Sequence, residues 1–288
     1  MKRQSTSTVD AGQQRAALLQ AFADGDDWAI ARSPAHLRDD DEYVLQMVTK
    51  NGMALHFASE RLRNDRATIL AAVSSNGHAI RYAPKFWADR EIMAKVVESS
   101  PAAIAIAAPD LREDGAFVRL CLEKDGDQLR VVPDEFRNDP ETAFVAAQTT
   151  AGAVRWASAR LLENADFMFR VLRVHGSDLQ WASDTIRGSK AHVIIAVQQD
   201  GLSLRFASAD LRNDSATVLE AVRQNAHALR YTSKQLLLTP RFVLDAQKVN
   251  PQASSTLRAA VGPEMNLRAL LACQEKEMKK LVVKAHKM

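Results

Sequence analysis

Cysteine is scarce in this sequence, and the charges nearly balance. Cys121 and Cys273 are the only two thiols in 288 residues, and two distant thiols cannot build a disulfide framework or a cysteine-rich zinc site. We therefore expect a reducing compartment. The formal net charge is only +3, from 38 basic and 35 acidic residues. Because a protein built to neutralise phosphate usually carries a stronger excess, any basic function must depend on where the charges lie.

Long hydrophobic runs are also absent. No stretch approaches the roughly 18 apolar residues of a membrane span, so we expect no membrane partner. The start, MKRQSTSTVDAGQQR, lacks the apolar core of a Sec signal peptide. Its Ser/Thr-rich composition suits either a disordered terminus or a bacterial type III secretion signal. The expected location is the cytoplasm, with secretion by a non-Sec route into a host cell as the alternative.

Catalytic signatures are missing as well. The chain contains no G-x-x-x-x-G-K-[ST] or G-x-G-x-x-G phosphate-binding motif, no H-E-x-x-H zinc motif and no G-x-S-x-G nucleophile turn. Its seven histidines never stand four residues apart, as two ligands on one helix face would. These observations predict a protein that is not an enzyme, with no catalytic residues, no metal site and no cofactor.

What the sequence does contain is a repeat. ASERLRNDRATILAAVSSNG at residues 58–77 returns as ASADLRNDSATVLEAVRQNA at residues 207–226. Aligning the chain on the aspartate of LRND gives one anchor every 25 residues, with a single step of 24 from Asp65 to Asp89. Every anchor is Asp, Asn, Ser or Thr, whose side-chain oxygen can accept a hydrogen bond from the first turn of a helix. The predicted N-caps are Asp40, Asp65, Asp89, Asp114, Asp139, Asn164, Ser189, Asp214 and Thr239.

An apolar stripe follows each anchor at positions four, five, seven and eight, with Arg119 and Gln247 as exceptions. This spacing predicts a helix of about ten residues, with an apolar face wide enough to contact neighbours on two sides. Pairs such as Asn51-Gly52 and Asp200-Gly201 then end the helix, because glycine tolerates the left-handed conformation of a helix terminus.

A shorter apolar segment comes after each stop, as in ALHFAS, AVRWAS and SLRFAS. Its alternation resembles a β-strand, but its i, i+3 spacing, its alanines and its tight linkage to the long helix favour a short second helix. An apolar residue, such as Leu62 or Leu211, stands in the predicted loop to the next anchor.

One such unit cannot bury its apolar faces alone, so stacking must supply the core and the ends need polar lids. We predict an all-α fold, an α-solenoid of about nine two-helix repeats with N- and C-terminal capping helices. Residues 1–27 would form a disordered start and an N-terminal capping helix, from Asp10 to about Ala23. Residues 28–250 would form the helical-repeat solenoid, and residues 251–288 the C-terminal capping helices, including LRALLACQEKEMKKLVVKAHKM.

The LRND cap, the apolar residue before it and the Gly turn recur together, and in this combination the chain resembles the family called domain of unknown function 4116. The resemblance extends from about Trp28 to Asn250 and is weakest around Ser189 and Thr239. It implies tandem short helices in largely bacterial proteins, which are frequently multi-domain or effector-like. It implies no established activity, so no catalytic residue is carried over.

Two arginine columns exceed what the repeat needs for folding. The first follows the apolar residue of the second helix, which must face inward, so we expect these side chains to point outward. Its members are Arg81, Arg130, Arg155, Arg205 and Arg230. The second stands two residues before the anchor and comprises Arg38, Arg63, Arg112, Arg137, Arg187 and Arg212. The structural alternative is that arginine stems cover apolar surface while their guanidinium groups pair with cap aspartates of adjacent repeats.

The candidate binding residues are the first column together with Trp156 and Trp181 from the neighbouring aromatic column, whose alternative role is in the core. They favour a non-catalytic protein-interaction scaffold that presents a curved repeat surface, as a bacterial effector-type or adaptor protein with a protein partner. The alternative is nucleic-acid binding through arginine ladders along the solenoid. The sequence leaves the oligomeric state open.

Overall fold

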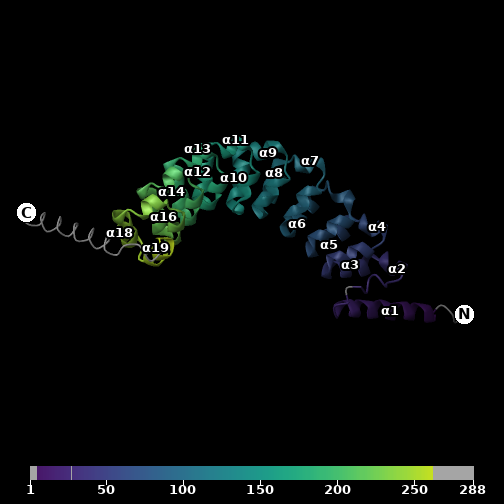
Figure 1. Cartoon of the computed structure of the whole chain (residues 1–288). Helices are drawn as coiled ribbons and strands as arrows, with labels where there is room; N and C mark the ends of the chain where they lie inside the picture. The colour runs from purple at the N-terminus through teal and green to yellow at the C-terminus, as the bar shows by residue number, and fades with distance from the viewer. Residues whose placement is uncertain (1–4, 27, 262–288) are drawn as a thin grey trace, which may run out of the picture. The chain divides into compact units, whose positions relative to one another are not determined.

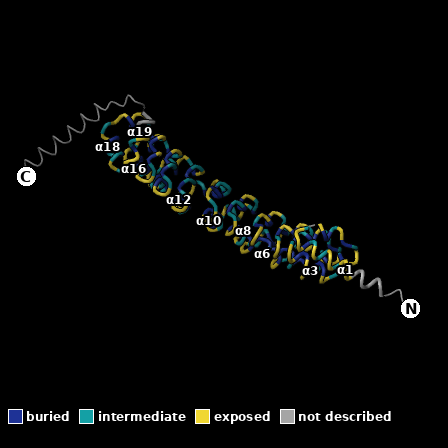
Figure 2. The backbone as a smooth tube through the Cα atoms, turned by 90° about the horizontal axis from the view of Figure 1, so that it is seen from below, coloured by how far each residue is buried: buried dark blue, intermediate teal, exposed yellow. Residues whose placement is uncertain are grey.

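The computed structural model describes residues 5–26 and 28–261, and every regular element in them is helical. The chain divides into two compact units, unit 1 (residues 1–133) and unit 2 (residues 134–288). Figure 1 labels the α-helices, and Figure 2 shows buried and exposed stretches alternating along each unit. The predicted all-helical fold is confirmed for the described part of the chain.

Long α-helices, 3₁₀-helices (η) and short α-helices follow one another in both units. Unit 1 contains α1 (Ser5–Ala23), α2 (Ala35–Arg38), α3 (Asp41–Lys50), η1 (Gly52–Phe57), α4 (Glu60–Arg63), α5 (Arg66–Ser75), η2 (Gly77–Tyr82), η3 (Pro84–Phe86), α6 (Arg90–Ser99), η4 (Pro101–Ala105), α7 (Pro109–Arg112), α8 (Gly115–Lys124) and η5 (Gly126–Arg130). Unit 2 contains α9 (Asp134–Asn138), α10 (Pro140–Thr149), η6 (Ala153–Trp156), α11 (Ala159–Leu162), α12 (Ala165–Val174), η7 (Gly176–Trp181), α13 (Asp184–Arg187), α14 (Lys190–Gln199), η8 (Gly201–Phe206), α15 (Ala209–Arg212), α16 (Ser215–Gln224), η9 (Ala226–Tyr231), α17 (Lys234–Leu237), α18 (Pro240–Val249) and α19 (Ala253–Val261).

Each predicted anchor stands at the N-cap of a ten-residue α-helix. Asp65, for example, accepts hydrogen bonds from the backbone N–H of Thr68 at 2.8 Å and from its hydroxyl at 2.7 Å. Ser189 and Thr239 occupy the N-cap position without a capping side-chain hydrogen bond. Ser189 Oγ lies instead 2.8 Å from His192 Nδ1. The predicted register and helix length are therefore confirmed.

The long helices end where the sequence predicts, but without a left-handed residue. Asn51 is extended, with φ −140° and ψ 102°, and in the described part of the chain only Gly25 and Gly152 have a positive φ. The Asn51 side chain accepts a hydrogen bond from Met53 N–H at 3.0 Å. Asn51 thus ends α3 and caps η1 with the same residue.

Glycine follows these stops because the next long helix passes very close. A Cβ on Gly201 would stand 2.5 Å from the carbonyl oxygen of Ala221 in α16, and a Cβ on Gly52 would collide with the carbonyl oxygen of Ala72 in α5. The conformational reason expected from the sequence was wrong, and close packing between successive repeats takes its place.

From α3 to α16 the segment after each stop is a 3₁₀-helix, and a short helix, α-helical except for η3, occupies what was predicted to be a loop. Between η1 and α5 lies α4, whose N-cap Ser59 accepts a hydrogen bond from Leu62 N–H at 3.3 Å. Leu62, predicted to stand in a loop, is fully buried on this helix. The repeating element consists of three helical segments rather than two. The second hydroxyl cap, such as Ser59, is the signal that would have predicted the third.

The long helices supply about half of the buried apolar residues. In unit 1, α3 packs on α5, α5 on α6 and α6 on α8; in unit 2, α10 packs on α12, α12 on α14, α14 on α16 and α16 on α18. Val218 and Val222, at positions four and eight of α16, are fully buried. Position five was predicted to belong to the contact stripe, yet Leu45 is 42% and Phe169 is 36% exposed. Each residue turns about 100° around a helix, so position five lies at the edge of the buried face in α3 and α12, while Leu244 at position five of α18 is buried.

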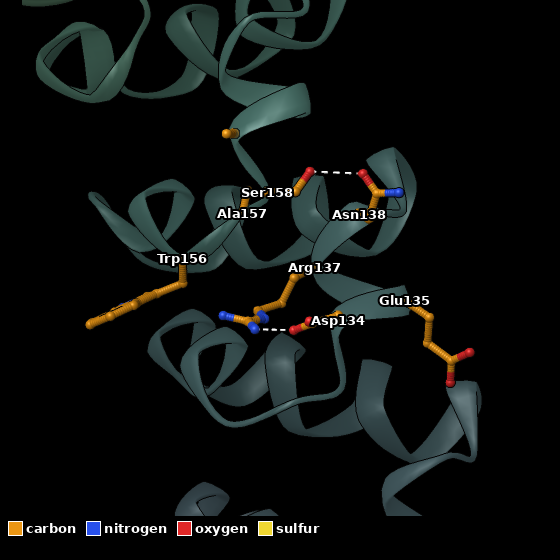
Figure 3. Close-up of a pocket in the computed structure, with 8 residues that line it drawn as sticks. Asp134, Glu135, Arg137, Asn138, Trp156, Ala157 and Ser158 are labelled. Carbon is orange, nitrogen blue, oxygen red and sulfur yellow. Dashed lines mark hydrogen bonds and ion pairs between the residues drawn. The ribbon is translucent and has the colours of Figure 1, made fainter.

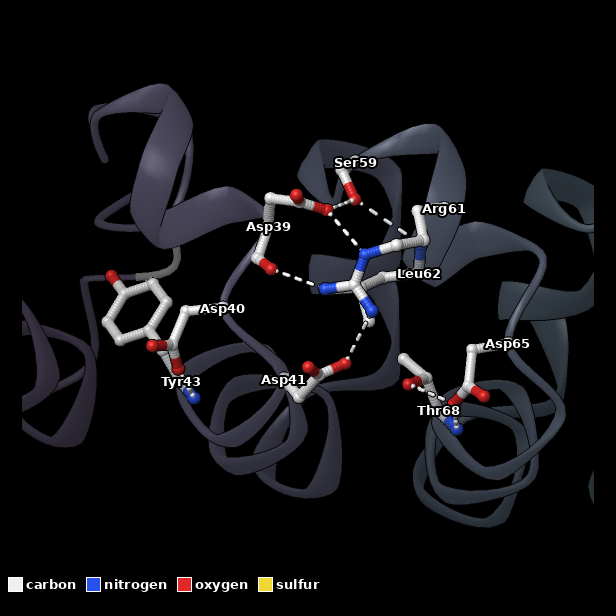
Figure 4. A network of polar contacts seen from close by, with 9 residues as sticks. All are labelled: Asp39, Asp40, Asp41, Tyr43, Ser59, Arg61, Leu62, Asp65 and Thr68. Carbon is white, nitrogen blue, oxygen red and sulfur yellow. Dashed lines mark hydrogen bonds and ion pairs between the residues drawn. The ribbon is translucent and has the colours of Figure 1, made fainter.

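Hydrogen bonds between short helices link neighbouring repeats (Figure 4). Ser59 N–H donates to the Arg38 carbonyl at 2.8 Å, so the start of α4 is tied to α2. Arg61 of α4 donates to the carboxylates of Asp39 and Asp41, through Nε at 3.0 Å and Nη1 at 2.8 Å. The network satisfies polar groups at exposed helix ends. None of its side chains belongs to the 3₁₀-helix η1.

The helices at the two ends are partly described. Helix α1 covers the predicted N-terminal helix and contacts α3, and α19 contacts α18 and η9. The rest of the predicted termini, in residues 1–4 and 262–288, lies outside the described residues.

Candidate interaction surface

The predicted arginines of the first column all lie on 3₁₀-helices. Arg81 is on η2 and Arg130 on η5 in unit 1, while Arg155, Arg205 and Arg230 are on η6, η8 and η9 in unit 2. Arg155 is half-buried and the other four are exposed. The outward orientation that we predicted is what the structure has for those four residues.

Four of these arginines take no part in the ion pairs between described repeats. Within the described residues, the four exposed members form no ion pair. Several cap aspartates are paired instead with cations of the long helices, as between Arg66 and Asp89 (3.0 Å) and between Lys190 and Asp214 (2.9 Å). The structural alternative, pairing with cap aspartates, therefore does not account for the four exposed arginines.

The second arginine column is structural in character. Its side chains are half-buried on the short helices, and Arg137 and Arg187 pair with acids three residues earlier, Asp134 and Asp184. Buried Nε atoms without a hydrogen-bond partner recur at Arg38, Arg63, Arg112, Arg137 and Arg212. Since the same burial recurs in both units, we assign these stems to packing.

The aromatic residues next to the first column lie at the surface edge of the 3₁₀-helices. Trp181 is 37% exposed, and Trp156 is half-buried with an indole N–H that has no partner. The guanidinium of Arg155 lies 5.0 Å from the centre of the Trp156 ring, and that of Arg205 lies 4.3 Å from the centre of the Phe206 ring. Cation–π contact of this kind holds the charge beside an aromatic face.

Consecutive 3₁₀-helices bring most of the unit 2 candidates together. Helix η6 contacts η7, η7 contacts η8, and η8 contacts η9. At the η6–η7 step, a Cβ on Gly152 would stand 3.5 Å from Arg155 Nη1 and 3.8 Å from Trp181 Nε1, so these two side chains lie over the same glycine. Gly152 has φ +83°, which explains its identity. In unit 1, Arg81 and Arg130 are not neighbours, because η4 stands between their helices in the chain with Ala105 at the equivalent position.

A buried carboxyl group that sequence reasoning missed lies behind this step. Asp178 is fully buried on η7, and its Oδ1 accepts a hydrogen bond from Gly152 N–H at 2.8 Å, while Oδ2 has no partner among the described residues. Burial raises the pKa of Asp178 to about 7, against the opposing effects of the Gly152 hydrogen bond and the charge of Arg155. The available signal was an acid at a position where other repeats have Ala54, Ala79 or Ala228.

We define the unit 2 surface as Arg155, Trp156, Trp181, Arg205, Phe206, Arg230 and Tyr231.

A pocket of about 570 Å³ adjoins Trp156 (Figure 3). Its other wall is formed by Arg137 and Asp134, which pair with each other, and Ser158 donates a hydrogen bond to Asn138 at 2.8 Å at its edge. Its charged groups are this ion pair and the exposed carboxylate of Glu135. It therefore extends the unit 2 surface as a polar recess rather than as a separate anion site.

We also searched the described part of the chain for a metal-binding cluster and for a membrane-spanning helix. No three His, Cys, Asp or Glu residues are grouped as a metal site would require. No described helix is long and apolar enough to cross a bilayer. Neither finding reaches the residues that the structure does not describe.

Comparison with known proteins identifies a family for two stretches of the repeat region. The model of the family described as domain of unknown function (DUF4116) matches residues 40–87 and 193–237. These two stretches are DUF4116 sequence. The first match begins at the cap of α3 and ends just after η3, and the second begins in α14 and ends on α17, so each match spans about two of the repeats described above. No curated protein and no solved structure matches the chain.

Proposed function

We propose that this protein is a non-catalytic scaffold that binds a protein partner along the unit 2 surface. In this proposal the nine long helices belong to one α-solenoid over residues 28–250, with α1 and the C-terminal helices as its lids. The DUF4116 stretches, the regular N-caps and the packing of successive long helices within each unit support a stacked repeat.

One observation carries the proposal. On η6 to η9 the exposed and half-exposed side chains include arginines beside aromatic rings, whereas the single carboxyl group of these helices, Asp178, is fully buried. Protein interfaces are enriched in arginine and aromatic residues. Arg205 and Arg230, which are exposed and form no ion pair within the described residues, favour a partner that supplies carboxylates.

The test is a charge-matched pair of triple variants. Arg155→Ala, Arg205→Ala and Arg230→Ala together should abolish recovery of a purified, identified partner. Their melting temperature should fall only slightly, because Arg205 and Arg230 are exposed charges that contribute little to stability and only Arg155 is half-buried. The control, Arg160→Ala, Arg173→Ala and Arg223→Ala, removes the same charge from other exposed positions of unit 2 and should bind normally. Equal binding by both triple variants would contradict the proposal.

Nucleic acid is the second candidate, favoured by the same arginines next to aromatic rings. Stacking of bases on such rings and contact of arginine with phosphate are the usual means of binding single strands. For three phosphate contacts, the logarithm of affinity should fall with the logarithm of salt concentration with a slope of about −2. A protein partner held by aromatic contacts would show a much weaker dependence.

We further propose that the protein acts in a cytoplasm, either of the bacterium that makes it or of a host cell that it enters as an effector. Cys121 is a free, buried thiol, and burial raises its pKa to about 12. Such a thiol is unreactive, which suits a reducing compartment. Translocation of a reporter fused to the first residues of the chain would distinguish the two locations.

A further inference from the structure

A second group of aromatic residues lies at the first 3₁₀-helix of unit 1. Trp28 is 65% exposed, and its ring meets that of Phe57 edge-on, with 5.9 Å between ring centres. His56 lies 4.8 Å from Phe57 and 4.7 Å from Tyr82 between ring centres. Four rings from three successive segments therefore form one continuous row.

This row borders a pocket of about 400 Å³, whose remaining lining residues are Asn51, Met53 and Ala54. The volume is within the range of sites that hold a small molecule or a large side chain. No carboxylate lines the pocket, so a cation entering it would find no ion-pair partner. The rings instead offer flat, polarisable faces and edges to another aromatic group.

The pocket lies where unit 1 departs from its repeat. His56 occupies the position that holds arginine at Arg81 and Arg130, and an arginine there would break the row of rings. The neighbouring aromatic positions become Ile106 and Val131 later in unit 1. An exposed tryptophan beside this local departure has no role in the buried core.

A free cation stands beside the row. Helix η1 contacts η2, and His56 and Arg81 hold equivalent positions on them. Arg81 is exposed and forms no ion pair within the described residues. A ligand that carries a carboxylate next to an aromatic ring could contact both the row of rings and the Arg81 guanidinium.

We propose that this aromatic pocket binds an extended segment of a partner protein, which inserts an aromatic side chain against Trp28, Phe57 and Tyr82 and places a neighbouring carboxylate against Arg81. The proposal shares with the proposed function only the premise that the partner is a protein. Its residues belong to unit 1, so the Arg155, Arg205 and Arg230 triple variant should bind such a segment normally.

The experiment titrates the full chain with fluorescently labelled model peptides. The first peptide carries one phenylalanine flanked by two acidic residues on each side; the second has alanine in place of phenylalanine, and the third has lysines in place of the acids. The first should bind, and the other two should bind at least about tenfold more weakly, because each lacks one of the two anchors. Binding of the first peptide should compete with neither tetramethylammonium nor a mononucleotide.

Three variants locate the site. Trp28→Ala should weaken binding of the first peptide at least about tenfold, and Arg81→Ala should weaken it and reduce its salt dependence. Leu238→Ala is the matched control, since Leu238 is an apolar side chain of unit 2 that is 70% exposed, and it should leave binding unchanged. Absence of binding, equal binding of the first and second peptides, or full binding by Trp28→Ala would each overturn the proposal. So would displacement by tetramethylammonium, which would indicate a cation cage, or by the mononucleotide, which would indicate a base-stacking site.

Discussion

Asp178 occupies a position that holds alanine in most repeats, yet it keeps a carboxyl group out of water. Its one hydrogen bond, from Gly152, holds the turn on which Arg155 and Trp181 lie. A neutral carboxylic acid can accept this bond at much lower cost than a buried carboxylate. We therefore expect the protonation state of the Asp178 carboxyl group to affect the positions of the Arg155 and Trp181 side chains in the unit 2 surface.

This linkage predicts a loss of stability with rising pH. The pKa of Asp178 is about 7 in the folded protein, whereas an aspartate in the unfolded chain has a pKa of about 3.9. Between these two values the folded state binds one more proton than the unfolded state, so the contribution of this group to stability falls as pH rises and stays low above pH 7. Asp178→Asn keeps the acceptor for Gly152 and does not ionise. We expect it to melt at a higher temperature than the wild type at pH 8, with the difference shrinking towards pH 4.

Asp184→Asn provides the comparison for this measurement. The Asp184 side chain is 93% exposed on α13, close in sequence to Asp178, and its replacement should leave the pH dependence of the wild type in place. An Asp178→Asn variant whose melting temperature tracks that of the wild type across this pH range would show that Asp178 is ionised in the fold.

For single residues, the sequence predicted where they lie better than why that residue type is needed there. Glycine at 52 and 201 was correctly placed at the helix ends, but a sequence does not show that Ala72 or Ala221 of the next repeat approaches within contact distance. Asp178 was visible only as an exception in an alanine column, and burial of an acid depends on the packing of neighbouring repeats. Outward-facing arginines were predictable because they follow a residue that must face the core.

At the scale of the helical element, the N-caps divide into two classes that can be compared. The Asp65 side chain caps α5 through Thr68, whereas Thr239 occupies the same position of α18 without a capping hydrogen bond. Asp65→Ala should lower the free energy of unfolding by about 1 kcal/mol, and Thr239→Ala should lower it much less. Urea denaturation of both variants measures the difference. Equal losses would mean that the hydrogen bond of the Asp65 side chain does not stabilise α5.

The boundaries of the long helices could be predicted because two independent signals, the cap and the stop, agree for most of them. The 3₁₀-helices could not be distinguished from α-helices, since both satisfy an i, i+3 spacing over six residues. The short α-helices were missed because a single turn leaves one buried residue, such as Leu62, and no periodic pattern.

At the scale of the whole molecule, stability should be assembled from neighbour contacts. Each long helix in unit 2 packs mainly on the helix before it and the helix after it, and an array of this kind responds to damage locally. The continuity of the predicted solenoid between units 1 and 2 is a part of our proposal, and local unfolding gives a way to examine it.

Val222→Asp places a charge in the core of unit 2, where Val222 is fully buried on α16. Burial of an unpaired carboxylate costs several kcal/mol, so α16 should open together with its neighbours α14 and α18. Amide hydrogen exchange read by mass spectrometry should then show faster exchange in these three helices, while α3 and α5 of unit 1 keep the protection of the wild type. The corresponding variant in unit 1, Val73→Asp on α5, should speed amide exchange in unit 1 and leave the protection of α14, α16 and α18 unchanged. Because nearest-neighbour coupling makes protection decay with distance along the array, an even loss of protection over both units in either variant would show instead that the chain unfolds as a single cooperative body.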